Sequence, residues 1–475
     1  MNFMELNDLI HSGEKEIVLD ADVTRRGEER PSGLERIDLD VDGLVIDGAG
    51  HIIDAWVDRP LFRCTAKGVV IRNATLKSAS SWEYGGAISN TGELTILNCK
   101  ISHSMGRGGA VYNEGKMSII NSHFLRNRGL NGSAVCNKGI LSIRDSSFNN
   151  NRATQGTVYN KGKLEVENST FTDNEALHSG AFDNYGDLMI RKSTITNNKA
   201  KVRGGAMCNK GKITIVDSVV SANKARYAGA IKNFKGEVSI LSSTFEGNAS
   251  LKGAAIFNKW ALVRVENSRF SKNNADDDGA IYNLMADLHI SKSMLDENDC
   301  PAIENKGKAE VCGCDFFKNK RGAIANFSKL AVADSKFTQN DSQWGGAIRN
   351  LNEMSVTNSA FDQNAAQYGG AIDNFKGDLT ISVCEFNKNS ACYGGALYTE
   401  RGRLEMTSSL LAKNSASKFG GALFNHTSQV VMSASAFNGN AADHEGGAIY
   451  NWPDKSVSCE LADCTFADNR PDDVF

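Results

Sequence analysis

Apolar and polar residues alternate in short runs along this chain, and the runs recur at a regular distance. Leu94-Thr95-Ile96 and Leu379-Thr380-Ile381 are typical of them. A period of two predicts β-strands in which every second side chain faces the same side. Each recurrence offers about three runs, so we expect three short strands per repeat.

The repeat reads Gly-Gly-Ala-Ile-x-Asn, then Leu-x-Ile, then Ser-x-Phe-x-x-Asn, and it occurs sixteen times between Gly85 and Asn469. Successive copies begin 21 to 26 residues apart, and Thr157 is the one substitution at the alanine. A fixed period of this length is typical of a solenoid in which each copy forms one layer.

One asparagine per repeat falls where the period of two points inward, and a second, in Phe-x-x-Asn, lies at a turn. A buried amide without a partner costs on the order of 1 to 3 kcal/mol. If each strand pairs with the same strand of the next copy, about 4.8 Å away, every amide can bond to its neighbour. We therefore expect Asn113, Asn137 and Asn160 to form a ladder, with the phenylalanines stacked inside and the glycine pair forming a tight corner.

These features predict an all-β fold, a right-handed parallel β-helix with about 16 regular turns and about three irregular turns before them. A leucine-rich repeat has a similar length, but its order of Leu and Asn is absent here. We expect one continuous domain made of a capping helix (1–14), the irregular turns (15–84) and the regular repeats (85–475). Phe3, Met4, Leu6, Leu9 and Ile10 lie on one side of that helix.

The glycine corner and the Phe-x-x-Asn motif together resemble the repeats of chlamydial polymorphic outer membrane proteins. They also resemble adhesin-like β-helix proteins of methanogenic archaea and some gut bacteria. Residues 42–54 (DGLVIDGAGHIID) and 68–73 (GVVIRN) are similar to the first turns of pectin-lyase-like β-helices. The resemblance covers nearly the whole chain and implies the fold. It leaves the activity open, because such helices carry lyases, hydrolases, epimerases and adhesins.

Composition and charge narrow the possible partners. The formal charge is −3, and no stripe of Lys and Arg follows the repeat, so we expect no nucleic-acid partner. The eleven cysteines are irregularly spaced, which favours reduced thiols. The first ten residues do not resemble a signal peptide, and no apolar stretch of about 18 residues occurs. We expect no membrane span, and a cytoplasmic protein as written or a surface protein if the chain is a fragment.

Aromatic residues recur at two positions of the later repeats. The alanine and the position two residues after it are expected to face outward, and the position three before the alanine lies at the glycine corner. At about 4.8 Å per turn, such rings would form a strip that can lie against sugar rings or an apolar surface. The alternative is that the rings stack on one another and only stabilise the corner. The candidate residues are Trp344, Tyr368, Tyr393 and Phe419 at the corner, and Tyr398, Phe424 and Tyr450 on the outward column.

Catalysis would need acidic side chains gathered from adjacent turns, for example two carboxylates about 5 to 9 Å apart. Arg349 and Asp373 are the nearest pair, and a surface ion pair is the simpler interpretation. Asp276, Asp277 and Asp278 could hold Ca²⁺, but a solvated acidic loop is the preferred interpretation, so we expect no metal site.

We therefore expect a non-enzymatic, adhesin-like repeat protein that needs no cofactor and binds a glycan or a cell-surface protein through one flank. A polysaccharide lyase or glycoside hydrolase is one alternative, and a structural spacer is another. The C-terminal end has no obvious cap in the sequence, so end-to-end self-association is a further expectation.

Overall fold

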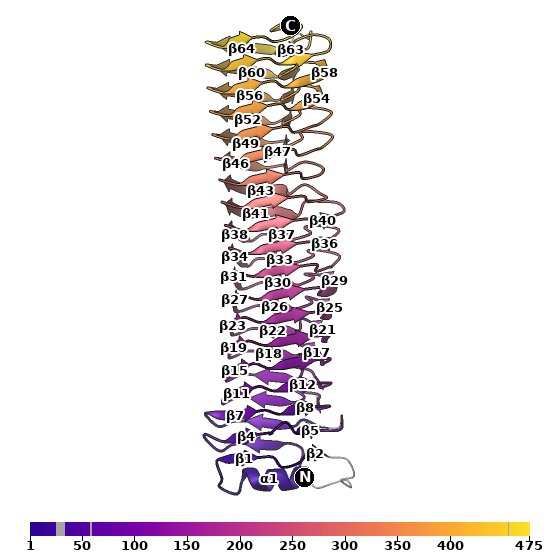
Figure 1. The fold of residues 1–475 in the computed structure, drawn as a ribbon, viewed down its shortest axis with the longest axis vertical. Helices are drawn as coiled ribbons and strands as arrows, with labels where there is room; N and C mark the ends of the chain where they lie inside the picture. The colour runs from indigo at the N-terminus through magenta and orange to yellow at the C-terminus, as the bar shows by residue number, and fades with distance from the viewer. Residues whose placement is uncertain (25–33, 58, 455) are drawn as a thin grey trace. The chain divides into compact units, whose positions relative to one another are not determined.

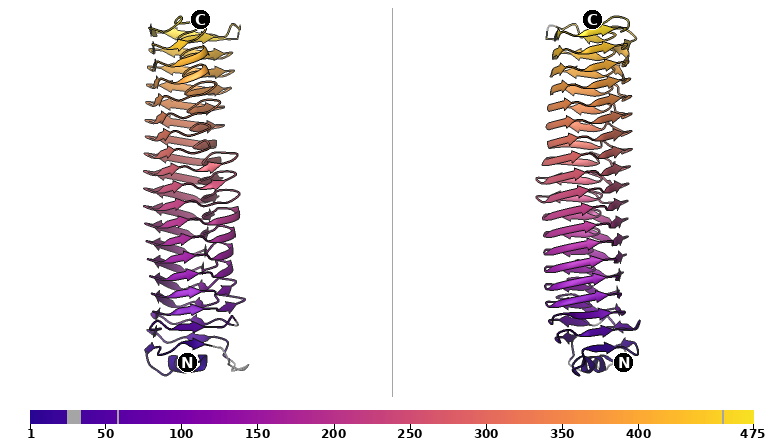
Figure 2. Two further views of the ribbon diagram at one scale, coloured as in Figure 1. Left: turned by 45° about the vertical axis from the view of Figure 1, so that its right-hand side comes forward. Right: turned by 60° about the vertical axis from the view of Figure 1, so that its left-hand side comes forward.

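The computed structural model describes residues 1–24, 34–57, 59–454 and 456–475. It is a right-handed parallel β-solenoid of about 18 turns with one short helix, which confirms the predicted fold class. The chain divides into two compact units, unit 1 (Met1–Ser239) and unit 2 (Ile240–Phe475). Within each unit, successive turns lie one above the next (Figure 1), and Figure 2 shows this stacking from two further sides.

One turn of unit 1 shows how the repeat folds. The glycine corner is followed by β18 (Val135–Asn137), β19 (Ile140–Arg144), β20 (Ser147–Asn149) and a corner strand, β21 (Arg152–Gln155). Each strand pairs in parallel and in register with the same strand of the next turn, as Val135 does with Val158. Equivalent residues of successive turns therefore form columns. The three predicted strands are present, and the corner strand is a fourth.

In unit 1, helix α1 (Phe3–Ile10) lies at the first turns (Figure 1). Phe3, Leu6 and Ile10 are buried, but Met4 and Leu9 are 39% and 36% exposed, so its contact face is narrower than predicted. The strands in the position of β18 begin with two from the irregular first turns, β3 (Ile37–Leu39) and β6 (Phe62–Cys64). Those after a glycine corner are β10 (Ile88–Asn90), β14 (Val111–Asn113), β18, β22 (Val158–Asn160), β26 (Phe182–Asn184), β30 (Met207–Asn209) and β33 (Ile231–Phe234). The corner strands are β9 (Ser80–Ser81), β13 (Met105–Gly106), β17 (Arg128–Asn131), β21, β25 (Glu175–His178) and β29 (Lys199–Arg203).

Unit 2 repeats this arrangement. One of its turns consists of β55 (Leu397–Glu400), β56 (Arg403–Thr407), β57 (Leu410–Ala412) and β58 (Ser415–Phe419). The strands after the glycine corner are β37 (Ile256–Lys259), β41 (Ile281–Ser291), β43 (Ile303–Cys312), β45 (Ile324–Asn326), β48 (Ile348–Asn350), β51 (Ile372–Phe375), β55, β59 (Leu423–His426) and β63 (Ile449–Asn451). The corner strands are β36 (Ala249–Ser250), β40 (Asn274–Ala275), β54 (Ser390–Tyr393), β58 and β62 (Ala441–Ala442).

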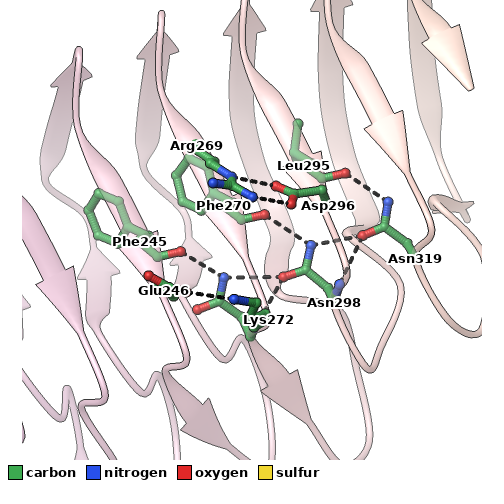
Figure 3. Close-up of polar contacts among 10 residues, drawn as sticks. Phe245, Glu246, Arg269, Phe270, Lys272, Leu295, Asp296, Asn298 and Asn319 are labelled. Atoms are coloured by element: carbon green, nitrogen blue, oxygen red, sulfur yellow. Dashed lines mark hydrogen bonds and ion pairs between the residues drawn. The ribbon is translucent and has the colours of Figure 1, made fainter.

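Both units carry asparagine ladders in their interior. In unit 1, Asn113 Nδ2 donates to Asn137 Oδ1 at 2.8 Å, and Asn137 Nδ2 donates to Asn160 Oδ1 at 2.8 Å. In unit 2, the second asparagine of each repeat does the same, and Figure 3 shows Asn298 Nδ2 donating to Asn319 Oδ1 at 2.8 Å. The ladders predicted from the repeat are confirmed, and they satisfy amides that would otherwise be costly to bury.

Phenylalanine rings fill the interior beside these ladders. In unit 1, the rings of Phe124, Phe148 and Phe171 stack with centroids 4.6 and 4.5 Å apart. In unit 2, four rings from Phe316 to Phe386 stack at 4.6 to 4.8 Å. Burial of one such side chain contributes roughly 1.5 to 3 kcal/mol, so each turn supplies its own share of the core.

The glycine corner differs from expectation at the alanine, which the sequence places facing outward. Ala371 is fully buried, and its N–H donates to the carbonyl oxygen of Ala396 one turn away at 2.9 Å. Gly369 has a φ of +62°, and a Cβ there would lie 2.1 Å from the carbonyl oxygen of Ile372. The corner is too tight for a side chain, and neighbouring turns cover the alanine.

Candidate functional site

The flank beside the glycine corner is built from three columns of side chains. The corner column ends each corner strand, and the outward column follows the alanine by two residues. A third column lies two residues further along the same strand, on the same side. On β55 and its corner these residues are Tyr393, Tyr398 and Glu400. The sharp corner brings the corner column against the outward column.

In unit 2 the two aromatic columns lie one over the other. Tyr398, Phe424 and Tyr450 are only 7%, 3% and 5% exposed, although the sequence leads us to expect both columns on the surface. Tyr368, Tyr393 and Phe419 cover them, with Tyr368 edge-on to Tyr398 at a centroid distance of 5.2 Å. The inner rings are buried because ring-on-ring contact removes a large apolar area from water.

A groove opens where this aromatic cluster meets polar side chains. Its volume is about 550 Å³, within the range of small-molecule sites. We call it the aromatic groove. Trp344, at the rim, is 39% exposed and pairs along the corner column with Tyr368. The groove is lined by Gln343, Trp344, Arg349, Gln367, Tyr368, Asp373, Phe375, Tyr398, Glu400 and His426.

The floor of the aromatic groove contains an ion pair that the sequence places at the surface. Arg349 Nε lies 3.4 Å from Asp373 Oδ2, and the Asp373 side chain is only 2% exposed. The Arg349 guanidinium also lies over the Trp344 ring, 4.5 Å from its centroid. Burial raises the pKa of Asp373 to about 7, although Arg349 opposes the shift. The floor therefore offers a carboxyl group that changes its charge near neutral pH.

The opposite wall gathers three further polar groups. The Tyr398 hydroxyl donates to Glu400 Oε2 at 3.0 Å and lies 3.3 Å from His426 Nδ1. Glu400 Oε2 also lies 3.6 Å from His426 Nδ1. Burial raises the pKa of Tyr398 further above its usual value, so the phenol stays protonated. These groups can donate to and accept from the hydroxyls of a ligand.

At the rim, Gln343 and Gln367 extend from successive turns, with Gln343 Nε2 3.4 Å from Gln367 Oε1. Trp344, Tyr368 and Tyr398 are candidates from the sequence pattern, and all three line the aromatic groove. The pattern misses the glutamines, Phe375, Glu400 and His426. Phe375, Glu400 and His426 could have been predicted from their position in the repeat. Each lies two residues after the outward column, and they occupy consecutive turns.

The remaining sequence candidates lie elsewhere. Tyr393, Phe419, Phe424 and Tyr450 belong to the aromatic cluster but do not line the groove. Among the described residues, no group of three or more His, Cys, Asp and Glu side chains is placed to hold a metal ion, and the Asp276, Asp277 and Asp278 run is no exception. Asp278 Oδ2 instead lies 3.1 Å from Lys252 Nζ.

Unit 1 carries different side chains on the same flank. Residues 191–235 contain 11 Lys and Arg and a single acidic residue, Asp217. This segment contradicts the expectation of no cationic stripe, because the small net charge of the whole chain masks it. Unit 1 has 31 Lys and Arg against 27 Asp and Glu, a charge of +4, whereas unit 2 has 22 against 29, a charge of −7. A charge count in a 45-residue window would have found it.

Comparisons with known proteins agree with the fold. Residues 42–200 match the model of the right handed beta helix region. The fold of the chain is that of a β-helix repeat protein. Residues 383–400 and 434–451 of this β-helix repeat protein match the Chlamydia polymorphic membrane protein repeat. None of the curated proteins matches the sequence.

Among solved structures, "a new PL6 alginate lyase complex with trisaccharide" is similar at 9% identity, over 98% of this chain and 81% of that chain. Its TM-score is 0.23, too low to support any conclusion about activity. Within the described residues, no helix is both long enough and apolar enough to cross a membrane.

Proposed function

We propose that this β-helix repeat protein is a non-enzymatic, adhesin-like binding protein whose aromatic groove takes a neutral carbohydrate. The observation that supports this most directly is the groove itself, in which the exposed Trp344 ring stands beside the Gln343 and Gln367 amides. An apolar ring with adjacent hydrogen-bonding groups matches the two faces of a sugar, one of C–H groups and one of hydroxyls.

The charges of the aromatic groove favour a neutral sugar over an acidic one. Arg349 is already held by Asp373 and by the Trp344 ring. Glu400 lies on the opposite wall, with its carboxylate accepting from Tyr398. A uronate or sulfate in the groove would meet these carboxyl groups without an unpaired cation to offset them.

A glycan and polysaccharide binding array tests the proposal. Trp344→Ala removes the exposed ring, and we expect binding of neutral glycans to weaken roughly tenfold or more. Trp82→Ala is the matched control, because Trp82 is 89% exposed and lies in unit 1. Both variants should keep the native circular dichroism spectrum. Equal binding by wild type and Trp344→Ala, or no saturable binding of any glycan, would reject the proposal.

One observation favours a second candidate function, a polysaccharide lyase or glycoside hydrolase. Asp373 and Glu400 line the same groove, and burial raises the pKa of Asp373 to about 7, as general acids often require. The test is the release of reducing ends or unsaturated products from polysaccharides. Product formation lost in both Asp373→Asn and Glu400→Gln would replace the binding proposal with an enzymatic one.

A further inference from the structure

We propose that a surface on unit 1, which we call the basic face, binds linear polysaccharides that carry sulfate or carboxylate groups. The basic face consists of Lys199, Lys201 and Arg203 on β29 and of Lys224 and Arg226 on the next turn. It lies in a different unit from the aromatic groove and does not depend on that groove's function.

The first observation is that these cations are not neutralised within the protein. Elsewhere in unit 1, cations pair with glutamates one turn away, as Lys116 Nζ does with Glu93 Oε1 at 2.6 Å. Among the described residues, the five side chains of the basic face take part in no ion pair. Four of the five are exposed, so a ligand can reach them.

The second observation is that like charges face each other. Lys199 pairs with Lys224 in a parallel bridge, so the two exposed lysines start from neighbouring positions on adjacent turns. On the other side of Lys199 stands Glu175, whose carboxylate already lies 3.3 Å from Arg152 Nε. Like charges directly opposite each other destabilise a sheet. An anionic ligand bound between the two lysines would remove this repulsion. The relief of repulsion would add to the attraction between the ligand and each lysine.

The positive charges of the basic face also affect the pKa values of His178 and Asp183, which lie beside it. The pKa of His178 is lowered by its burial and by the nearby charges of Arg203 and Lys232. Asp183 is 5% exposed, and burial raises its pKa to about 6, against the pull of Arg203 and Lys210. With a pKa of about 6, the Asp183 carboxyl group is mostly ionised at neutral pH and offsets part of the charge of Arg203. Among the described residues, the four exposed cations of the basic face still take part in no ion pair.

The spacing of the cations favours an extended polymer over a single small anion. Adjacent turns are about 4.8 Å apart, and Lys199 and Lys201 are about 7 Å apart along one strand. Cations therefore recur in two directions across the surface. A chain with an anionic group on successive sugar rings can contact several of them at once, which a small anion cannot.

Two tyrosines within the same flank favour a polysaccharide over a single-stranded nucleic acid. Arg226 lies over the Tyr227 ring at 5.4 Å, and Lys210 lies over the Tyr185 ring at 4.8 Å. Base stacking on single strands needs open aromatic faces. Here the cations occupy a face of each ring, so charge contacts dominate the surface.

The experiment measures binding of the full chain to heparin, polygalacturonate, neutral dextran and a single-stranded DNA at low and at about 0.15 M salt. The test variant is Lys199→Ser/Lys201→Ser/Lys224→Ser. The control variant is Lys336→Ser/Lys388→Ser/Lys413→Ser, which removes the same charge from exposed positions of unit 2. We expect heparin or polygalacturonate binding to weaken about tenfold or more in the test variant and to stay within twofold in the control.

Heparin binding without polygalacturonate binding would assign sulfate as the recognised group, and the reverse result would assign carboxylate. Equal weakening in both variants would overturn the proposal, because it would show an effect of net charge alone. Tighter binding of the single-stranded DNA than of either acidic polysaccharide would overturn it as well. So would a lack of binding to either polysaccharide at low salt.

Discussion

The same three columns of side chains flank the glycine corner in both units, yet the side chains in them differ in charge and polarity. In unit 1 the corner column holds Arg203 where unit 2 holds Tyr368 and Tyr393. The outward column holds Asp183 in unit 1 and Asp373 in unit 2, each nearly buried. The repeat constrains the interior strictly, because every amide and ring must meet its neighbour. The flank is free to vary, and recognition can be placed there without a change of fold.

The two aspartates show how far the surroundings alone can change one side chain. Burial raises the pKa of Asp183 to about 6 and that of Asp373 to about 7. Asp183 lies among cations that stabilise its charged form, whereas Asp373 has Arg349 on one side and Glu400 opposing it. We expect the two units to be alike in the stability of their interior and to differ in the contacts of their flanks.

The largest effect should be the same in both units. Phe148→Ala in unit 1 and Phe361→Ala in unit 2 each remove a fully buried, stacked ring. We expect each to lower local stability by about 3 to 5 kcal/mol. Amide hydrogen exchange of the mutated turn is the measurement, because long repeat arrays lose two-state behaviour. A clear difference between the two variants would show that the interiors are not equivalent.

The pH dependence of stability should separate the units. A carboxyl group whose pKa is raised on folding stabilises the fold fully below its unfolded pKa, near 3.8, and loses that contribution as pH rises through the folded value. From pH 4 to 8, we expect wild type to lose up to about 4 kcal/mol relative to Asp373→Asn, and up to about 3 kcal/mol relative to Asp183→Asn.

Hydrogen exchange at β51 and β26 across that pH range measures both differences. A loss on lowering the pH, instead of on raising it, would contradict the raised pKa values. If the two variants gave the same profile, the surroundings of the two aspartates would not differ as the structure indicates.

Hydroxyl removal on the outward column should have a moderate effect in one unit only. Tyr398→Phe removes the donor to Glu400 and should lower local stability by about 1 kcal/mol. Tyr159→Phe, at the same column in unit 1, should change it by less than about 0.5 kcal/mol, because no hydrogen bond of the Tyr159 hydroxyl joins it to the described residues. Amide hydrogen exchange of the mutated turns checks both variants. Equal losses of stability would contradict a stabilising hydrogen bond between Tyr398 and Glu400.

The smallest effect concerns surface charge within unit 1. Lys199→Gln removes a repulsion and should raise local stability by about 0.3 kcal/mol at low salt, whereas Lys116→Gln breaks its pair with Glu93 and should lower it by a similar amount. Both effects should vanish at about 1 M salt. Stabilisation by Lys116→Gln would show that the pairing seen here contributes nothing.

Much of the fold follows from the repeat. Asn137 recurs at the same place in nearly every copy, and Phe148 in most of them. A buried amide or a large ring at a fixed period is satisfied by its equivalent on the next turn. Part of the site follows as well. Trp344, Tyr368 and Tyr398 are found from their spacing, and Arg349 and Asp373 are recognised as neighbours one turn apart. Glu400 and His426 are missed, because one glutamate and one histidine form no pattern by themselves.

The amino-acid sequence by itself therefore determined the period, the strands, the interior ladders and the glycine corner, since each depends on contacts between equivalent residues of successive copies. Only the tertiary structure decided which outward side chains stay exposed. Tyr368 covers Tyr398 from 30 positions away, and Arg349 lies beside the buried Asp373 from 24 positions away. These residues need not resemble one another. Burial in the flank depends on the size and direction of non-equivalent neighbours, and no repeat pattern records these.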